Sequence, residues 1–366
     1  MVCVTHWIQK LTANNLSTVP DPAPGQFPTP PHLGRLRAGP LNAMTDVAGV
    51  SIGHSTLNQS DIQTGVTVIR AHAKSHFTHK VPAAAVVING FGKSVGLMQL
   101  DELGVFETPI ALTNTFSVPV LAQAQIKQAI ALHPEIGRTW PTVNPLVFEC
   151  NDGYLNDIQA FAVKQEHYAQ AHDSANTHLR QGAVGAGRGM SCFELKGGIG
   201  SASRLVTADG RLYTVGALVL ANFGKRDQLT LNGQPVDTTT RNTSQEPEKG
   251  SIIVILATDA PLDARQLRRL ATRSTVGLAR TGSLLGHGSG DIALAFSTAY
   301  TIPHDRSDDM PAIPMVHEQE LDGLFHAVAD SVEQSILHAL WYAESVTGRA
   351  GHHRQSLLHA YPGLGA

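Results

Sequence analysis

The sequence predicts a layered α/β sandwich, in which helices cover buried strands. Three observations support this prediction. Short apolar runs at residues 81–90 (VPAAAVVING), 212–224 and 252–257 are typical of buried strands. Apolar residues elsewhere recur at helical spacing, most clearly over 321–340. Among the 366 residues, 42% are hydrophobic and 16% are charged, which indicates an ordinary globular chain that can bury a large core.

The first 38 residues are expected to form a Pro-rich arm. The stretch PDPAPGQFPTPPHLG favours extended backbone, because proline and the residue before it disfavour helix. One domain is expected to follow, from residue 39 to residue 366. The N-terminus lacks the basic and apolar regions of a signal peptide, and no apolar run reaches about 18 residues. A cytoplasmic protein without a membrane span is therefore expected.

The predicted elements follow one another along this domain. Helices are predicted over 96–104, over 119–132 and from residue 151, where Leu155, Ile158, Phe161 and Ala162 have helical spacing. The polar stretch 235–250 (PVDTTTRNTSQEPEKG) predicts a mobile surface loop. After the strand at 252–257, Pro261 suits a first helical turn, and an apolar helix face follows at Leu267, Leu270, Ala271, Ser274 and Leu278. Residues 291–300 (DIALAFSTAY) predict another buried strand.

Charge and cysteine content exclude several classes of protein. A net charge of -3 provides no long-range field for nucleic acid or an anionic membrane, so neither is expected as a partner. Cys3, Cys150 and Cys192 are too widely spaced for a disulfide framework and indicate a reducing cytoplasm. The histidines at 72, 76 and 79 have ligand-like spacing, but no carboxylate or second histidine pair accompanies them. A solvated loop is expected there, and no metal site.

Glycine-rich stretches suggest nucleotide binding but fail its patterns. In GAVGAGRGM, the third glycine of a dinucleotide fingerprint would fall at Met190. In GFGKS, the first glycine of a phosphate-binding loop would fall at Val87. Neither stretch therefore predicts a nucleotide site.

The junction of Gly250 and Ser251 carries the most informative pattern. A polar loop ends at Gly250, and the buried strand begins directly after Ser251. If this peptide bond were cut, Ser251 would gain a free α-amine with a pKa of about 7.7–8.0, which could act as the base for its own hydroxyl. Gly250, without a Cβ, permits strained backbone and easy attack on its carbonyl. From these residues alone, a plain turn into a strand remains the simpler interpretation.

Two further stretches place polar residues at strand ends. Ser289 and Asp291 could hold a proton near the new amine, although in a turn such residues usually cap backbone groups. Asn222 ends a predicted buried strand, where its amide could stabilise an oxyanion or simply satisfy the strand end.

Taken together, the chain resembles the self-processing L-aminopeptidase/D-amidase/esterase family, which is related to the β-peptidyl aminopeptidases. The resemblance covers about residues 38–300 and rests on an ordered series of segments: GPLNAMTDVAGVSIGHST, VVINGFGK, LDELGVFETPIALTNT, NDGYLND, GAVGAGRGMSCFELKGGIGSASR, ALVLANFG, GSIIVILATDAPL and GHGSGDIALAFSTA. It implies a four-layer αββα sandwich, self-cleaved between residues 250 and 251 into α and β chains. It also implies a homo-oligomer, commonly a tetramer, and no metal or organic cofactor.

The resemblance implies roles for particular residues. Ser251 matches the N-terminal nucleophile, Ser289 its assisting serine, Asp291 an acid that is glutamate in some relatives, and Asn222 the oxyanion donor. The expected substrates are short peptides and aminoacyl amides or esters. Candidates for substrate binding are Tyr154, Glu149, Asp152 and Asn89; Glu149 and Asp152 could bind a free ammonium group, or merely cap a helix.

Other functions remain open within and beyond this family. A β-aminopeptidase or an oligoamide hydrolase would share the fold and differ in pocket residues. A related self-cleaving acyltransferase would use threonine at the nucleophile position, which Ser251 disfavours. An uncleaved binding protein for small amines or peptides is the alternative from a different class.

Overall fold

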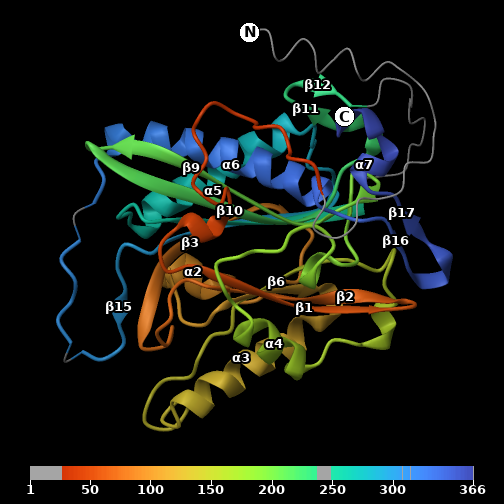
Figure 1. Ribbon diagram of the computed structural model, residues 1–366. Helices are drawn as coiled ribbons and strands as arrows, with labels where there is room; N and C mark the ends of the chain where they lie inside the picture. Colours follow the sequence, from red (N-terminus) through yellow and green to blue (C-terminus); the bar gives the residue numbers. More distant parts are fainter. Residues whose placement is uncertain (1–26, 237–248, 307, 314, 366) are drawn as a thin grey trace.

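The computed structural model describes residues 27–236, 249–306, 308–313 and 315–365. Its helices and strands form four layers, with a pair of helices on either side of two stacked sheets (Figure 1). Three large apolar cores fill the three spaces between these layers. This arrangement confirms the predicted four-layer αββα sandwich.

The larger sheet holds the central strands of the fold. Its order is β15 (Ile302–Pro303), β3 (His79–Gly90), β14 (Gly288–Ser297), β13 (Lys249–Thr258), β10 (Arg211–Asn222) and β9 (Gly198–Ala208), and β4 (Val105–Phe106) also pairs with β3. The strands β13 and β14 run parallel and are connected through helix α5 (Ala264–Arg280), whereas β14 with β3, β13 with β10 and β10 with β9 are antiparallel pairs.

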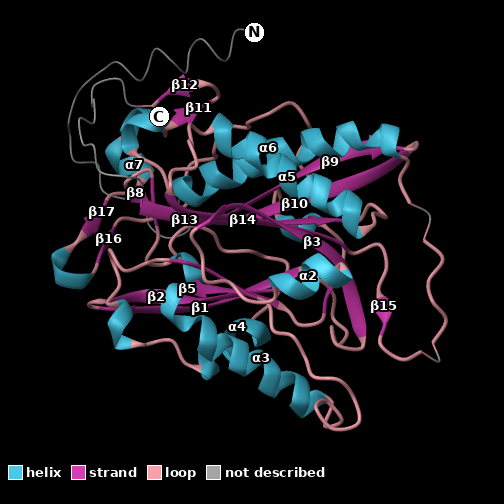
Figure 2. Ribbon diagram, turned by 180° about the vertical axis from the view of Figure 1, so that it is seen from behind, coloured by secondary structure: helices cyan, strands magenta, loops and turns pink. Residues whose placement is uncertain are grey.

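The smaller sheet has the order β1 (Ser51–Gln59), β2 (Ile62–Arg70), β5 (Ile110–Asn114) and β6 (Val147–Cys150). Helices α3 (Val118–Leu132) and α4 (Gln165–Asp173) cover its outer face (Figure 2). Its inner face packs against the larger sheet. The four strands of this sheet were not predicted from the sequence.

Side chains along β13 alternate between two apolar cores, which explains why this strand lies in the middle of the larger sheet. Ile252, Val254 and Leu256 belong to the core beneath the helices α5 and α6 (Leu321–Trp341). The intervening residues Ile253, Ile255 and Ala257 belong to the core between the two sheets. Successive side chains of a strand point to opposite faces, so only a continuously apolar run fills both cores. The prediction of a strand buried on both faces is confirmed.

The two long helices α5 and α6 cover the outer face of the larger sheet (Figure 1). The predicted apolar face of α5 is buried. Pro261 nevertheless lies before the helix, because Asp263 is the N-cap and accepts the N–H of Gln266 at 2.6 Å. The prediction that Pro261 forms the first turn is therefore wrong.

The predicted helix from residue 151 is mostly irregular. Only α4 at its end is an α-helix, preceded by one short 3₁₀ turn at Ile158–Ala160. The Asn151 side chain accepts the N–H of Gly153 at 2.9 Å, and Phe161 has a positive φ of 48°. Local side-chain bonds and the left-handed residue break the helix that the apolar spacing suggested.

The described part of the Pro-rich arm lies against α6. Leu33 donates its N–H to Gln334 at 2.7 Å, and the indole of Trp341 donates to the carbonyl of Pro28 at 2.7 Å. Residues 1–26 of the arm and 237–248 of the predicted surface loop lie outside the described residues.

Short elements complete the fold. They are α2 (Leu97–Leu103), β7 (Ser191–Cys192), β8 (Leu195–Lys196), β11 (Thr230–Leu231), β12 (Gln234–Pro235), β16 (Val346–Thr347), β17 (His353–Arg354) and α7 (Leu357–Ala360). Among the described helices, none is both long and apolar enough to cross a membrane.

Candidate active site

Ser251 lies near the start of β13, in the middle of the larger sheet. In the strand register it is opposite Asn222 on β10 and opposite Gly290 on β14. Its side chain is buried, and its hydroxyl donates to the carbonyl oxygen of Gly250 at 2.6 Å. The nucleophile candidate is thus held in a regular strand, in contact with the peptide bond whose cleavage the sequence suggests.

Two glycines make room around this serine. A Cβ on Gly250 would lie 2.6 Å from the carbonyl oxygen of Asn222 and 2.8 Å from Cα of Phe223. A Cβ on Gly290 would lie 2.4 Å from the carbonyl oxygen of Phe91 and 3.2 Å from Oγ of Ser251. Close backbone approach therefore requires glycine at both positions. Gly250 does not have a positive φ, so the strained backbone that a glycine would permit is not seen there.

Ser289 and Asp291 lie on β14, directly beside β13. Ser289 is opposite Gly250 in the register, and its hydroxyl donates to Oδ1 of Asp291 at 2.6 Å. Both side chains are 1% exposed. A hydroxyl bonded to a buried carboxylate has a defined orientation and can pass a proton, and the shorter aspartate reaches its serine here.

Asn222 has an amide of fixed orientation at the end of β10. Its Oδ1 accepts the N–H of Ser191 at 2.8 Å, and its Nδ2 donates to the carbonyl of Asn151 at 3.0 Å. An amide nitrogen carries two hydrogens, and the described residues use one of them. The other is available where Asn222 borders the cavity described next, as an oxyanion donor requires.

A cavity of about 890 Å³ opens in front of Ser251. Its wall includes Glu149, whose side chain is only 3% exposed. The Glu149 carboxylate accepts the N–H of Lys93 at 2.8 Å and the hydroxyl of Thr115. These bonds hold a negative charge at the wall of the cavity, where it can pair with an ammonium group. The remaining lining side chains are Phe91, Lys93, Thr115, Asn151, Tyr154, Ile158, Ser191, Glu194, Asn222, Phe223, Lys225, His287 and Arg354.

The other predicted binding residues differ in whether they reach this cavity. Tyr154 lines it, with its ring stacked on His352 at 4.6 Å between centroids. Asn89 does not line it, and donates to the carbonyl of Gly286 at 2.7 Å instead. Asp152 is also absent from the lining and is 0% exposed. Its Oδ1 accepts the amide of Asn156 at 3.0 Å.

The position of Asp152 predicts an unusual pH dependence of stability. Burial raises the pKa of this carboxyl from 3.8 to about 7. The pKa of Asp152 is higher in the folded protein than in the unfolded chain, so the protonated carboxyl favours the folded state. This contribution to the free energy of unfolding is fully present below pH 3.8 and is lost as the pH rises through 7. Relative to Asp152→Asn, the wild-type protein should lose about 3 kcal/mol of unfolding free energy between pH 5 and pH 8. Urea unfolding of both proteins at the two pH values measures this difference, and parallel pH profiles would contradict it.

Some residues of the site were not singled out from the sequence. Ser191 and Asn151 orient Asn222, and Thr115 orients Glu149, all through contacts between distant segments. Ser191, Asn151 and Thr115 all lie in segments that carry the resemblance, which was the available signal. Arg354 lies beyond residue 300, where the resemblance ends, so nothing in the sequence pointed to it.

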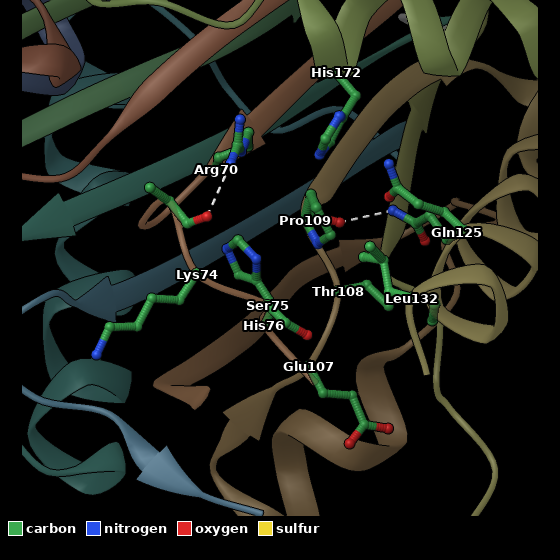
Figure 3. A pocket seen from close by; sticks show the side chains of 13 residues that line it. Arg70, Lys74, Ser75, His76, Glu107, Thr108, Pro109, Gln125, Leu132 and His172 are labelled. Atoms are coloured by element: carbon green, nitrogen blue, oxygen red, sulfur yellow. Dashed lines mark hydrogen bonds between the residues drawn. The ribbon is translucent and has the colours of Figure 1, made fainter. Parts of the chain in front are cut away.

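A second hollow of about 260 Å³ lies between the end of β2 and the helices α3 and α4 (Figure 3). On its wall, the amide of Gln125 donates to the carbonyl of Pro109 at 2.7 Å (Figure 3). Ser75 contacts Nε2 of His133 at 2.8 Å, but no described carboxylate orients this imidazole. This hollow therefore lacks the parts of a catalytic triad.

The histidines near this hollow differ from the expectation of a solvated loop. His76 is 5% exposed and stacks on His72, with 4.3 Å between ring centroids. The expectation is wrong for His76, because its ring also packs against Phe106 in the core. Among the described residues, no group of three or more His, Cys, Asp or Glu side chains is placed to hold a metal ion.

Comparison with known proteins agrees with this geometry. The model of peptidase family S58 matches residues 42–354. The beta-peptidyl aminopeptidase BapA of Sphingosinicella microcystinivorans is 37% identical over 352 residues, which cover 88% of this chain and 87% of that protein.

Two solved structures are also similar. A beta-aminopeptidase of a Burkholderia species superposes with a TM-score of 0.83 at 40% identity, covering 90% of this chain and 94% of the other. The L-aminopeptidase D-Ala-esterase/amidase of Ochrobactrum anthropi, described as a prototype serine aminopeptidase and a variant of the Ntn hydrolase fold, has a TM-score of 0.83 at 35% identity. That match covers 91% of this chain and 94% of the other.

Proposed function

The chain belongs to peptidase family S58, and from this premise we propose that it is a self-processing aminopeptidase whose nucleophile is the hydroxyl of Ser251. It is an enzyme of the serine aminopeptidase type with an Ntn hydrolase fold. One observation carries the assignment of the nucleophile. Ser251 lies between Asn222 and Ser289–Asp291 on neighbouring strands, at a cavity that also holds the Glu149 carboxylate.

Maturation is proposed to begin with attack of Ser251 on Gly250. The Oγ of Ser251 adds to the Gly250 carbonyl carbon, and the C–N bond then breaks. The hydroxyl proton passes to the departing nitrogen, which leaves an ester between Gly250 and Ser251. Water hydrolyses this ester and releases the Gly250 carboxylate and a free α-amine on Ser251. The contact of 2.6 Å between the hydroxyl and the Gly250 carbonyl oxygen supports this first step.

Substrate hydrolysis then reuses the same hydroxyl. The Oγ of Ser251 attacks the carbonyl of the substrate's first residue, and the α-amine of Ser251, assisted by Ser289 and Asp291, takes the proton. The free N–H of Asn222 donates to the oxyanion. The leaving amine departs with a proton, and water hydrolyses the acyl-enzyme. The hydrogen bond of 2.6 Å from the Ser289 hydroxyl to Oδ1 of Asp291 supports their role in holding the proton.

The proposed substrates are short peptides and aminoacyl amides or esters with a free amino terminus. Glu149 would pair with the substrate ammonium group, because its buried carboxylate borders the cavity. Peptides that begin with a β-amino acid are the second candidate, which the names of two relatives favour.

The cleaved units are further proposed to assemble as a homotetramer. The proposed location of this homotetramer is the cytoplasm. Large apolar side chains on α2 are exposed, with Met98 at 88% and Leu103 at 63%, and would suit a subunit contact. Cys150 is a free and buried thiol, which suits a reducing compartment.

Replacing Glu149 with glutamine tests the amino-terminal specificity. A glutamine at this position would keep an acceptor for the Lys93 N–H, and its NH₂ group could donate to the Thr115 hydroxyl, so the fold should persist without the charge. We expect kcat/KM for an aminoacyl p-nitroanilide with a free amine to fall at least about tenfold. Glu135→Gln, which removes an exposed carboxylate that does not line the cavity, is the matched control and should leave kcat/KM unchanged.

Two results would contradict the proposal. One is that the wild-type protein hydrolyses N-acetylated and free aminoacyl substrates equally well. The other is that Glu149→Gln has no more effect than Glu135→Gln.

A further inference from the structure

The active-site cavity carries opposite charges on its two sides. On the side of β3, the Glu149 carboxylate accepts the N–H of Lys93, which lies in the segment just after that strand. On the side of β10, Nε of Arg354 donates to Oγ of Ser191 at 3.2 Å. The backbone N–H of Ser191 in turn donates to the side chain that ends β10. Glu149 itself lies on β6 of the smaller sheet, next to Gly92 in the segment after β3. The order in the larger sheet is β3-β14-β13-β10, so Ser251 on β13 lies between the segment that contacts Glu149 and the strand whose end contacts Ser191.

Among the described residues, the Arg354 guanidinium is held in place by neutral groups. It lies 3.7 Å from the centroid of the Tyr154 ring, which stacks on His352, the residue just before β17. Its Nε is bonded to Ser191, while the four N–H groups of the two terminal nitrogens have no hydrogen-bond partner among the described residues. No carboxylate in the described part of the chain forms an ion pair with it. Guanidinium remains charged, and two such nitrogens match the two oxygens of a carboxylate.

Arg354 shares this side of the cavity wall with one described carboxylate. This carboxylate is that of Glu194, which attracts the guanidinium through space without forming an ion pair with it. The Glu194 side chain is directed in part to the backbone N–H of Arg226, from which it accepts a hydrogen bond at 3.4 Å. The terminal N–H groups of Arg354 therefore favour an anionic group of the substrate on this side. The Glu149 carboxylate favours a cationic group on the other side, where the Lys93 ammonium lies over the Phe91 ring.

We propose that Arg354 binds the C-terminal carboxylate of the substrate, so that the enzyme prefers short peptides with a free C-terminus, dipeptides above all, over the corresponding amides and esters. This inference rests on the proposed function. A peptide with its ammonium group at Glu149 and its first carbonyl at Ser251 extends its leaving residue toward β10. Its carboxylate then meets the guanidinium fork in a bidentate pair. A cavity of about 890 Å³ has room for such a ligand.

A pair of substrates with the same scissile bond tests this inference. The processed wild-type enzyme is assayed with a dipeptide Xaa-Ala and with its amide Xaa-Ala-NH₂, where Xaa is the residue hydrolysed fastest as a p-nitroanilide. We expect kcat/KM to be about 10- to 100-fold higher for the free acid, the range of a charge-assisted hydrogen-bonded pair. This comparison needs no variant, so it does not depend on the folding of one.

Variants of Arg354 then assign the preference to this side chain. Arg354→Gln should remove the preference by lowering kcat/KM for the acid while changing that for the amide less than about threefold. Arg354→Lys keeps a charge without the planar fork and should retain part of the preference. Arg138→Gln, which removes an exposed arginine that does not line the cavity, is the matched control and should behave as wild type.

Three results would overturn the inference. Equal kcat/KM for acid and amide in the wild-type enzyme would exclude a carboxylate site. An equal loss on both substrates in Arg354→Gln would show that Arg354 acts by positioning Ser191 and Asn222. Failure of the wild-type protein to hydrolyse any free aminoacyl p-nitroanilide or dipeptide would overturn the proposed function itself, and this inference with it.

Discussion

Ser251→Ala is expected to yield one intact chain of residues 1–366 with no hydrolytic activity, whereas the wild-type protein is expected to split into residues 1–250 and 251–366. The alanine variant lacks the hydroxyl that we propose to attack Gly250, so it should never gain the free α-amine. Both maturation and turnover should therefore stop together. Intact mass under denaturing conditions, N-terminal sequencing and a p-nitroanilide assay measure the two effects.

The fold of this variant should be unaffected, because the substitution removes only one buried hydroxyl and its bond to the Gly250 carbonyl. Thermal unfolding of the variant provides this control. Ser251→Thr provides a second one, since an N-terminal threonine carries the same functional groups and should still split slowly. Cleavage at residue 250 in Ser251→Ala would refute self-processing by this serine. An intact wild-type chain would revive the alternative of an uncleaved binding protein.

Asn222→Ala is expected to lower kcat by about 10²- to 10³-fold, the usual effect of removing one oxyanion donor. The KM should change much less, because the oxyanion exists only in the transition state and the tetrahedral intermediate. Steady-state kinetics on the processed enzyme separates the two parameters.

Asn222 also accepts the N–H of Ser191, so a structural effect has to be separated from the loss of the donor. Asn222→Asp keeps that acceptor and the side-chain shape but replaces the donor with a carboxylate oxygen. It should reduce kcat at least as much as Asn222→Ala. Recovery of activity in Asn222→Asp would show that Asn222 only positions Ser191, and a large rise in KM with unchanged kcat would assign it to substrate binding.

The local sequence by itself determined the strands and helices that carry the site. Ile252 to Ala257 are apolar at every position, and this short run is typical of a strand whose two faces are both buried. Periodic apolar residues likewise predicted α5 and α6. The Gly250–Ser251 junction could be proposed as a cleavage site because a nucleophile that frees its own amine needs a hydroxyl directly after the bond that is cut.

The prediction of a helix from residue 151 rested on apolar spacing alone, and it was wrong. The spacing of Leu155, Ile158 and Phe161 suggested a helix, yet the segment is irregular and lines the cavity through Tyr154 and Ile158. The Asn151 side chain accepts a backbone hydrogen bond in this segment. Such local hydrogen bonds stabilise a non-helical backbone, and the spacing of apolar residues does not reveal them.

The composition of the site was decided only by the tertiary structure. Glu149 and Asp152 lie close together in the sequence, and both were equal candidates for the ammonium site. The fold turns Glu149 to the cavity and buries Asp152 against Asn156. Arg354 reaches Ser191 although 163 positions separate them in the chain. The physical reason is that strand register and loop packing bring together residues distant in sequence, and hydrogen-bond partners then decide which polar side chain faces the substrate.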